Sequence, residues 1–455
     1  MRDIPNTPPD LPALRADPLA DAAIARMLGA GAGQPDLDAI ALLNRQLAGW
    51  ESNGDLAGWR ADAGLPAPMA QALEDFVQAA RILPDWADPA KIARAEALFM
   101  DMSMLSCTLL FCASLPACYV LPDLAAVLQV SGQLERHTDY RVRSTAAMIF
   151  PVMMKGGLTA PAGGGVAQAL KVRLIHATIR HLVLRGAPRP GQPPLEPLQP
   201  AGPTLHHLLH AHGWDPARRG LPVNQEELAY TLLTFSYAFL QGLRRLGQGL
   251  PRADEEAYLH AWNVLGHLLG IERALMADTM EQAATLFEDI QARVHALGGR
   301  AGRDDPRPAL AAALMQAMQR YIPLRVLKPF PVLLTRLLCG ARSARVLGLD
   351  AHAAPAARAV FMLGLGLTRA IDALGGLLVP GFSLARLVTR IFGYHLVTRF
   401  LMDQTRPLKL PAALLGQVDA TVRRWQQDPR APAWMRAVER RFTRGARSRD
   451  TESQA

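Results

Sequence analysis

The sequence predicts an all-α protein, and three features of its composition and patterning support this fold class. Half of its 455 residues are hydrophobic and only 20% are charged, which provides enough apolar mass for a large core. Aromatic residues make up 6% of the chain, so most of that apolar mass is Leu and Ala, which favour helices. No run of alternating β-branched residues predicts a half-buried strand. We therefore expect one large helical domain.

The first half of the chain predicts a leader followed by a series of helices. Residues 1–20 are rich in Pro, so we expect a flexible leader there, with the helical domain spanning 21–405. The turn ILPDWADPAK precedes the third helix, and the glycines of KGGLTAPAGGG predict a loop. Helices are expected at 37–50, 68–82, 89–115, 122–130 and 138–154, and then through KVRLIHATIRHL to a stop near Gly186.

The second half begins with a Pro-rich loop at 187–203. Asn224 stands three residues before Glu227, a spacing that predicts a reciprocal helix cap, and Asp254 is expected to cap the next helix. Later helices are expected at 307–320, 324–340, 355–379, 383–403 and 410–427. Residues 406–455 would form a C-terminal helix and a basic tail.

An uncharged stretch, Met102–Leu121, is long enough to cross a membrane. It contains Ser, Thr and Pro residues, and its flanks lack aromatic belts, so we interpret it as a buried core helix. Four cysteines, Cys107, Cys112, Cys118 and Cys339, form no paired framework and are expected to be buried, reduced side chains. The N-terminus lacks the apolar segment of a secretory signal, which favours the cytoplasm.

The net charge of +9 gathers largely in the tail, where nine arginines follow residue 422. Without aromatic residues arranged for base stacking, this tail does not indicate nucleic-acid binding. Trp434 and Phe442 lie among these arginines, an arrangement compatible with peripheral membrane contact, and the alternative is a solvated end.

His176 is unusual because it falls within an apolar stripe of its expected helix. At about 100° per residue, Val172, Ile175, Ile179 and Val183 share that stripe. Lys171, Arg173, Thr178, Arg180 and His181 are then expected to point elsewhere. His176 is either an ordinary buried histidine with a backbone partner or a ligand. The pairs His206/His210 and His260/His267, and His395, are interpreted as structural or solvated rather than as metal ligands.

Arg141 poses a similar question in the preceding helix, where it shares a face with Thr145, Met148 and Val152. A buried guanidinium keeps its charge and needs an anion. That anion could be a distant carboxylate or a cofactor that carries carboxylates. Haem would answer both questions, since it takes an axial imidazole and places propionates near cationic or hydroxyl groups.

Six segments in order resemble the DUF2236 family, which contains the latex clearing proteins (rubber oxygenases) and the MpaB-type oxygenases. The resemblance covers most of residues 65–350. Its segments are LPDWADPAKIARAEALF, Arg141 with Thr145, VRLIHATIR, GLPVNQEELAYTLLTFS, WNVLGHLLGI and LLTRLLCGARSARVLGL. The resemblance implies a globin-like helical core around one haem b, with His176 as the proximal iron ligand and Arg141 and Thr145 near the haem.

The implied activity is oxidation or cleavage of a carbon–carbon double bond in an apolar, isoprenoid-like substrate by dioxygen. The substrate would be a hydrophobic small molecule or polymer. In latex clearing proteins a lysine follows the arginine by three residues, and here Ser144 stands at that position. Their distal glutamate has no convincing counterpart in Asp123 or Glu135. The alternatives are a haem-binding or peroxidase-like protein without this chemistry, and a membrane-associated helical protein without a cofactor.

Overall fold

The computed structural model describes residues 11–29, 36–102, 104–130, 138–185, 214–296, 305–320, 322 and 328–352, with parts of 358–370. All regular elements within these ranges are helical, which confirms the predicted all-α class. Several predicted features lie outside the described residues. They are Glu135, the His206/His210 pair, His395, the helices expected at 383–403 and 410–427, the boundary at 405, Trp434 and Phe442, and the basic tail.

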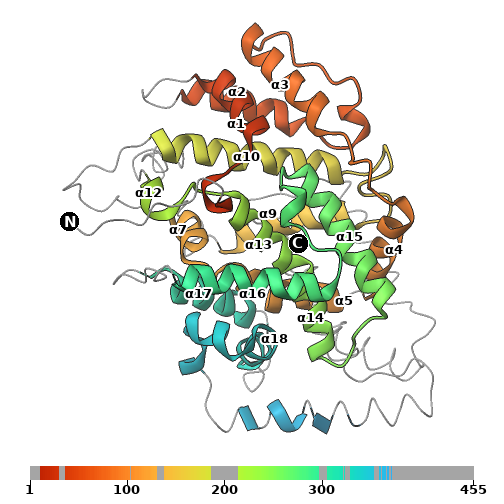
Figure 1. Cartoon of the computed structure of the whole chain (residues 1–455), viewed down its shortest axis with the longest axis vertical. Coiled ribbons are helices and arrows are strands. Elements are labelled where there is room, and N and C mark those ends of the chain that lie inside the picture. Colours follow the sequence, from red (N-terminus) through yellow and green to blue (C-terminus); the bar gives the residue numbers. More distant parts are fainter. Residues whose placement is uncertain are drawn as a thin grey trace, which may run out of the picture.

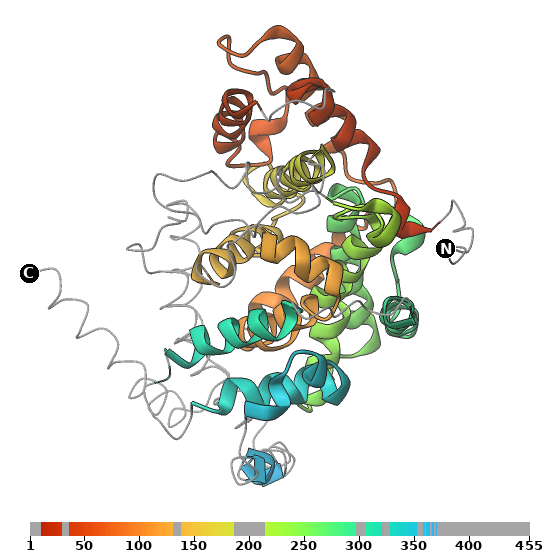
Figure 2. The same cartoon turned by 90° about the vertical axis from the view of Figure 1, so that its left-hand side faces the viewer.

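The helices form successive layers along the long axis of the molecule (Figure 1). At one end lie α1 (Pro18–Leu28), α2 (Leu37–Ala48) and α3 (Ala67–Ala80), and α10 (Gly165–Arg185) crosses directly beneath them. α1 packs on both α3 and α10, and α10 packs on α9 (Thr138–Met153). In a view turned by 90°, α17 (Arg307–Arg320) and α18 (Phe330–Val346) lie at the opposite end (Figure 2).

The remaining helices surround the centre of the domain. α4 (Pro89–Met102) packs along α15 (Arg252–Leu268), and α13 (Gln225–Phe235) contacts both α15 and α16 (Met280–Ala296). Short helices complete the layers: α7 (Pro122–Val130), α12 (Pro216–Arg219) and α14 (Tyr237–Arg245).

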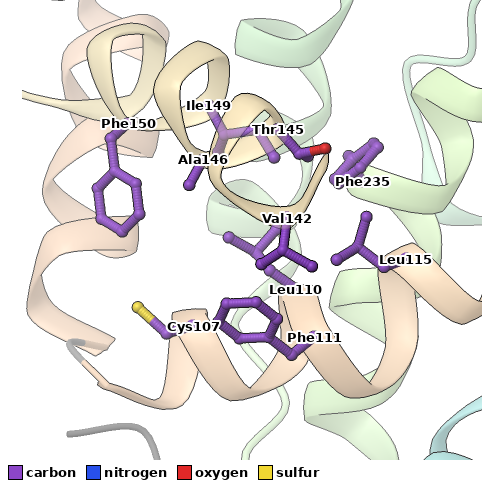
Figure 3. A pocket seen from close by; sticks show the side chains of 10 residues that line it. All are labelled: Cys107, Leu110, Phe111, Leu115, Val142, Thr145, Ala146, Ile149, Phe150 and Phe235. Atoms are coloured by element: carbon purple, nitrogen blue, oxygen red, sulfur yellow. The ribbon is translucent and has the colours of Figure 1, made fainter. Parts of the chain in front are cut away.

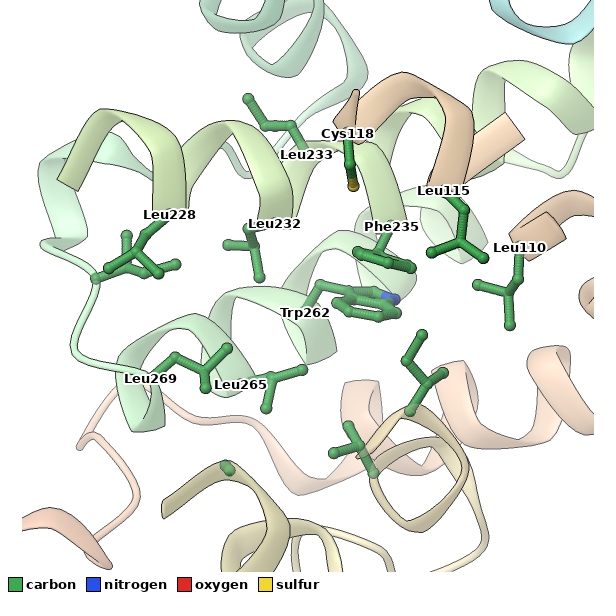
Figure 4. Close-up of a cluster of buried hydrophobic side chains, with 14 of the residues drawn as sticks. Leu110, Leu115, Cys118, Leu228, Leu232, Leu233, Phe235, Trp262, Leu265 and Leu269 are labelled. Atoms are coloured by element: carbon green, nitrogen blue, oxygen red, sulfur yellow. The ribbon is translucent and has the colours of Figure 1, made fainter. Parts of the chain in front are cut away.

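One continuous apolar core connects these layers. Near its middle the rings of Phe235 and Trp262 stack at 5.6 Å with an interplanar angle of 13° (Figure 4). Phe239 of α14 stacks on Tyr258, which lies one turn before Trp262 in α15, at 4.9 Å. These stacks fix α13 and α14 against α15, because aromatic rings bury large areas and prefer defined geometries.

The uncharged stretch Met102–Leu121 is not one straight helix. It divides into α5 (Met104–Leu109), a π-helical turn (Leu110–Ser114) and α6 (Leu115–Cys118), and residues 105–118 are buried. No single helix in the described ranges has both the length and the apolar character for a membrane span. α4 and the segment Leu105–Cys118, bent by 92°, meet those criteria only together. The interpretation as buried core holds for these residues.

Two ion pairs attach α1 to α10. Arg173 donates to Asp17 from Nε at 2.5 Å and from Nη2 at 2.9 Å, and both side chains are buried. Arg180, one of the most buried charged residues, donates to Asp21 at 2.6 Å and to the carbonyl of Val223 at 2.7 Å. The prediction that Arg173 and Arg180 point away from the core is therefore wrong. Packing also begins before residue 20, within the stretch expected to be a leader.

The cap at Asn224 is confirmed, and the one at Asp254 is not. The Asn224 side chain accepts a hydrogen bond from the Glu227 N–H at 2.9 Å. α15 instead begins at Arg252 behind Pro251, which has no side chain to cap it, and Asp254 accepts two hydrogen bonds from Arg94 at 2.7 Å. With Pro251 instead of Asp254 at the N-cap position, this helix starts three residues earlier than predicted.

We expect Asp17→Asn to lower the free energy of unfolding by about 3 kcal/mol, because it leaves the buried Arg173 charge without a counter-ion. Asn still caps α1, so the charge is the main change. Asp75→Asn is the matched control, since Asp75 pairs with Arg26 at an exposed site. Urea denaturation measures both variants, and equal losses would contradict the importance of the Asp17–Arg173 pair.

The buried carboxyl group of Glu227 should make the free energy of unfolding depend on pH. Burial, and then the nearby Asp123 carboxylate, raise its pKa from 4.5 to about 8. Its contribution to stability is therefore fully present below pH 4.5 and is lost as the pH rises through 8, with a slope of at most about 1.4 kcal/mol per pH unit. Glu227→Gln should flatten this profile in urea denaturation series. Parallel profiles for variant and wild type would show that Glu227 is ionised in the folded protein.

Candidate functional site

An apolar cavity lies between α9 and the broken helix at the centre of the domain (Figure 3). It is small and partly open, with a cavity volume of about 20 Å³. Its walls come from α5, the π-helical turn, α6, α9 and α13. The lining residues are Cys107, Leu110, Phe111, Leu115, Val142, Thr145, Ala146, Ile149, Phe150 and Phe235.

The π-helical turn explains how one side of the cavity is shaped. Pro116 has no N–H to donate to the carbonyl of Cys112, so the ordinary helical bond is missing there. The thiol of Cys339 donates to this carbonyl at 3.7 Å and to that of Ala113 at 3.5 Å. A π-turn widens the helix locally and is frequent at functional sites. Here it places Leu110 and Phe111 in the cavity wall.

α9 supplies the opposite wall, with Thr145 as its polar residue. Val142, Ala146 and Ile149 are buried beside it, so the hydroxyl of Thr145 stands among hydrocarbon groups. Thr145 therefore lies where the sequence analysis predicted a site residue. Ser144, at the position of the family's lysine, is half-buried on the same helix. Arg141 belongs to α9, but its side chain is outside the described part of the structure.

His176 lies on α10, the helix that packs along α9, and is half-buried with its Nδ1 atom shielded from solvent. It is not one of the residues that line the cavity. The predicted apolar stripe around it is only partly correct. Val172 and Ile179 pack partly buried against the core and Val183 is buried, but Ile175 is 47% exposed.

The other histidines near the core have structural partners. Nε2 of His260 accepts a hydrogen bond from the N–H of Asp88 at 2.8 Å, and Trp86 contacts the rings of both His260 and His267. These contacts fasten the turn before α4 to α15, as the structural interpretation predicted. Asp123, considered as a distal carboxylate, lies 3.7 Å from Arg219 in an ion pair.

The cysteines behave as buried hydrophobic residues. All four are free, three of them are buried and Cys339 is half-buried. Burial raises the pKa of Cys107 and of Cys112 to about 12, so both are thiols rather than thiolates at neutral pH. Cys107 consequently presents a neutral group to the cavity.

A metal cofactor at this site would have to bring most of its own ligands. Within the described ranges, no group of three or more His, Cys, Asp or Glu side chains is arranged to hold a metal ion. Haem b would need only an axial imidazole from the protein, because the porphyrin supplies four nitrogen donors. His176 on α10 is the predicted donor, and it lies outside the cavity lining. Thr145 adds a hydroxyl to a wall that is otherwise apolar or thiol-bearing.

The fold and cavity define a class: an all-helical domain built around an internal apolar site. Residues 102–371 match the family model described as ER-bound oxygenase mpaB/B'/Rubber oxygenase, catalytic domain. This match covers more than half of the chain, and the chain belongs to that family. The matched region contains the π-helical turn, α9 and α10.

Individual relatives agree with the family assignment. A rubber oxygenase from Streptomyces sp. (strain K30) is 26% identical over 237 residues, which are 51% of this chain and 51% of that protein. The chain thus aligns with about half the length of this relative. A solved structure of latex clearing protein in the closed state resembles the fold with a TM-score of 0.58 and 19% identity, covering 91% of each chain.

Sequence reasoning missed the part of the cavity wall that α5 and the π-helical turn provide, namely Cys107, Leu110 and Phe111. The uncharged stretch Met102–Leu121 indicated burial, but nothing in it distinguished a cavity wall from solid core. Pro116 was the available signal, since a proline inside an expected helix indicates a local break in its hydrogen bonding.

Proposed function

We propose that the protein is a haem b-dependent oxygenase that uses dioxygen to oxidise a carbon–carbon double bond in an apolar, isoprenoid-like substrate. The observation that carries this proposal is the cavity wall, which combines nine side chains without a hydroxyl, amide or charge and the hydroxyl of Thr145. Such a wall favours a hydrocarbon over an ionic or sugar-like substrate. Membership of an oxygenase catalytic-domain family supports the reaction class.

In the proposed function, His176, Arg141 and Thr145 would each have a separate role. His176 would hold the iron from α10, and Arg141 would neutralise propionate charge from α9. Thr145 would offer a hydrogen bond inside the cavity, and the surrounding hydrocarbon groups would exclude water from the reacting carbon. When bound, haem b supplies a redox-active iron for dioxygen chemistry.

A second candidate, haem binding with peroxidase-like chemistry or without turnover, is favoured by a specific observation. None of the ten lining residues is a carboxylate, histidine or lysine, and the Cys107 thiol has a pKa of about 12. No group in this wall can therefore act as a general base near neutral pH. Oxygen consumption with an isoprenoid or polyisoprene substrate separates the two candidates, because only the first consumes dioxygen with the alkene.

We expect His176→Ala to abolish the Soret band of haem-reconstituted protein, since the axial ligand is lost. His181→Ala is the matched control, because it removes a histidine from the same helix, one that contacts Arg185. This control should keep the wild-type spectrum. Absorption spectra of the three proteins check the prediction, and a bleached His181→Ala protein with an intact His176→Ala protein would reverse the assignment.

Arg141→Ala is expected to weaken haem retention about tenfold, because a propionate would lose a charge-assisted hydrogen bond. Arg143→Ala, two residues along α9, serves as its control. The rate of haem transfer to an excess of apomyoglobin measures retention. Identical transfer rates for Arg141→Ala and wild type would refute the role of Arg141.

A further inference from the structure

The turn that joins α9 to α10 is tightly packed against its own backbone. A Cβ atom at Gly157 would lie 2.2 Å from the carbonyl oxygen of Pro151, and one at Gly163 would lie 2.2 Å from that of Gly156. Only glycine fits at these positions. The turn is therefore a compact unit, and it connects the helix that bears Thr145 to the helix that bears His176.

The side chain of Asn53, more than a hundred residues earlier in the chain, holds this turn together. Its amide nitrogen donates to the carbonyls of Gly157 at 2.8 Å and Ala160 at 2.9 Å. Its oxygen accepts from the N–H groups of Val166 at 2.9 Å and Ala167 at 3.4 Å. Asn53 thus uses two donors and two acceptor sites, the full capacity of a carboxamide.

Two of these four bonds act on the first turn of α10. Val166 and Ala167 are among its first residues, whose N–H groups have no partner within the helix. The backbone near Asn53 adds two more bonds, from its own N–H to Gly163 at 2.6 Å and from Gly54 to Pro161 at 2.8 Å. Asn53 therefore caps α10 and fixes the turn leading into it.

A second residue supports the turn from α4. Glu96 is 3% exposed, and its carboxylate accepts from the N–H of Gly156 at 2.8 Å. Asn53 and Glu96 both lie before residue 102, where the family match begins. The parts of the chain that hold the α9–α10 turn thus come from outside the matched catalytic region.

We propose that Asn53 is a positioning residue that sets the direction of α10 relative to α9, and hence the position of His176 relative to the cavity wall; this inference rests on the proposed haem function. His176 lies ten residues beyond Val166, which is about 15 Å along a helix. A tilt of about 5° at the first turn would displace His176 by about 1.3 Å over that length. Iron ligation is sensitive to displacements of this size.

The test uses Asn53→Ala in the full-length protein, with Asp36→Ala as the matched control. Asp36 caps α2 by accepting from Ala39 at 2.9 Å, so its loss also removes a helix cap but leaves α10 untouched. We expect Asn53→Ala to raise the rate of haem loss at least about tenfold and to shift the iron–histidine stretching band in resonance Raman spectra of the ferrous protein. Asp36→Ala should change neither.

A second variant and a second readout keep the test decisive if Asn53→Ala folds poorly. Asn53→Asp retains the acceptor for Val166 and Ala167 but loses both donors, so its iron–histidine band should shift less. Hydrogen exchange of the Val166 and Ala167 amides, measured without haem, should be faster in Asn53→Ala than in wild type and less affected in Asn53→Asp, which keeps their acceptor.

The outcomes separate this inference from the function on which it rests. Wild-type protein that takes up no haem would contradict the proposed function itself. If wild type binds haem, an Asn53→Ala variant with unchanged haem loss and an unchanged iron–histidine band would overturn the role of Asn53 alone.

Discussion

The buried ion pair between Arg173 and Asp17 is the constraint on which the arrangement of the site depends. A guanidinium cannot lose its proton inside a protein, so Arg173 can be buried on α10 only where a carboxylate meets it. Asp17 does so from the start of α1, and Asp21 meets Arg180 two turns further along α10. The two pairs fix the rotation of α10 about its own axis, because any other rotation would separate both arginines from their counter-ions.

His176 stands between these two arginines in sequence, so its direction is a consequence of theirs. The rotation of α10 is set by α1, and its starting point is set by Asn53 at its first turn. A site built on a helix held at several places is more precise than one carried by a loop. The N-terminal layer thus contributes to the site without touching the cavity, whose lining residues all come from positions 107–235.

The fold class and most helices could be predicted from the sequence, since helix formation depends on local patterns of apolar residues and breaks at Pro and Gly. The cap at Asn224 followed from local spacing, and α9 places Thr145, a predicted site residue, in the wall of the cavity. The orientation of α10 could not be predicted in the same way. An apolar stripe predicts the buried face of a helix only when its charged residues are exposed to solvent. On α10 two arginines are buried instead, because carboxylates about 160 residues away in the sequence form ion pairs with them. The role of Asn53 could not be predicted for the same reason, because its four hydrogen-bond partners are far from it in the sequence and become its neighbours only in the folded chain.

The composition of the cavity wall limits the chemistry that the site can perform. A hydrocarbon wall would hold the proposed alkene by shape and by the exclusion of water, but it offers no proton acceptor for a step that must remove a proton. Any proton acceptor in the described wall would have to be Thr145 or the Cys107 thiol, and neither ionises near neutral pH. For the proposed alkene substrate, this wall therefore favours addition to the double bond over deprotonation of the substrate. Ser144, where the resemblance to latex clearing proteins implies a lysine, leaves this limit unchanged, because a serine hydroxyl is not a base near neutral pH.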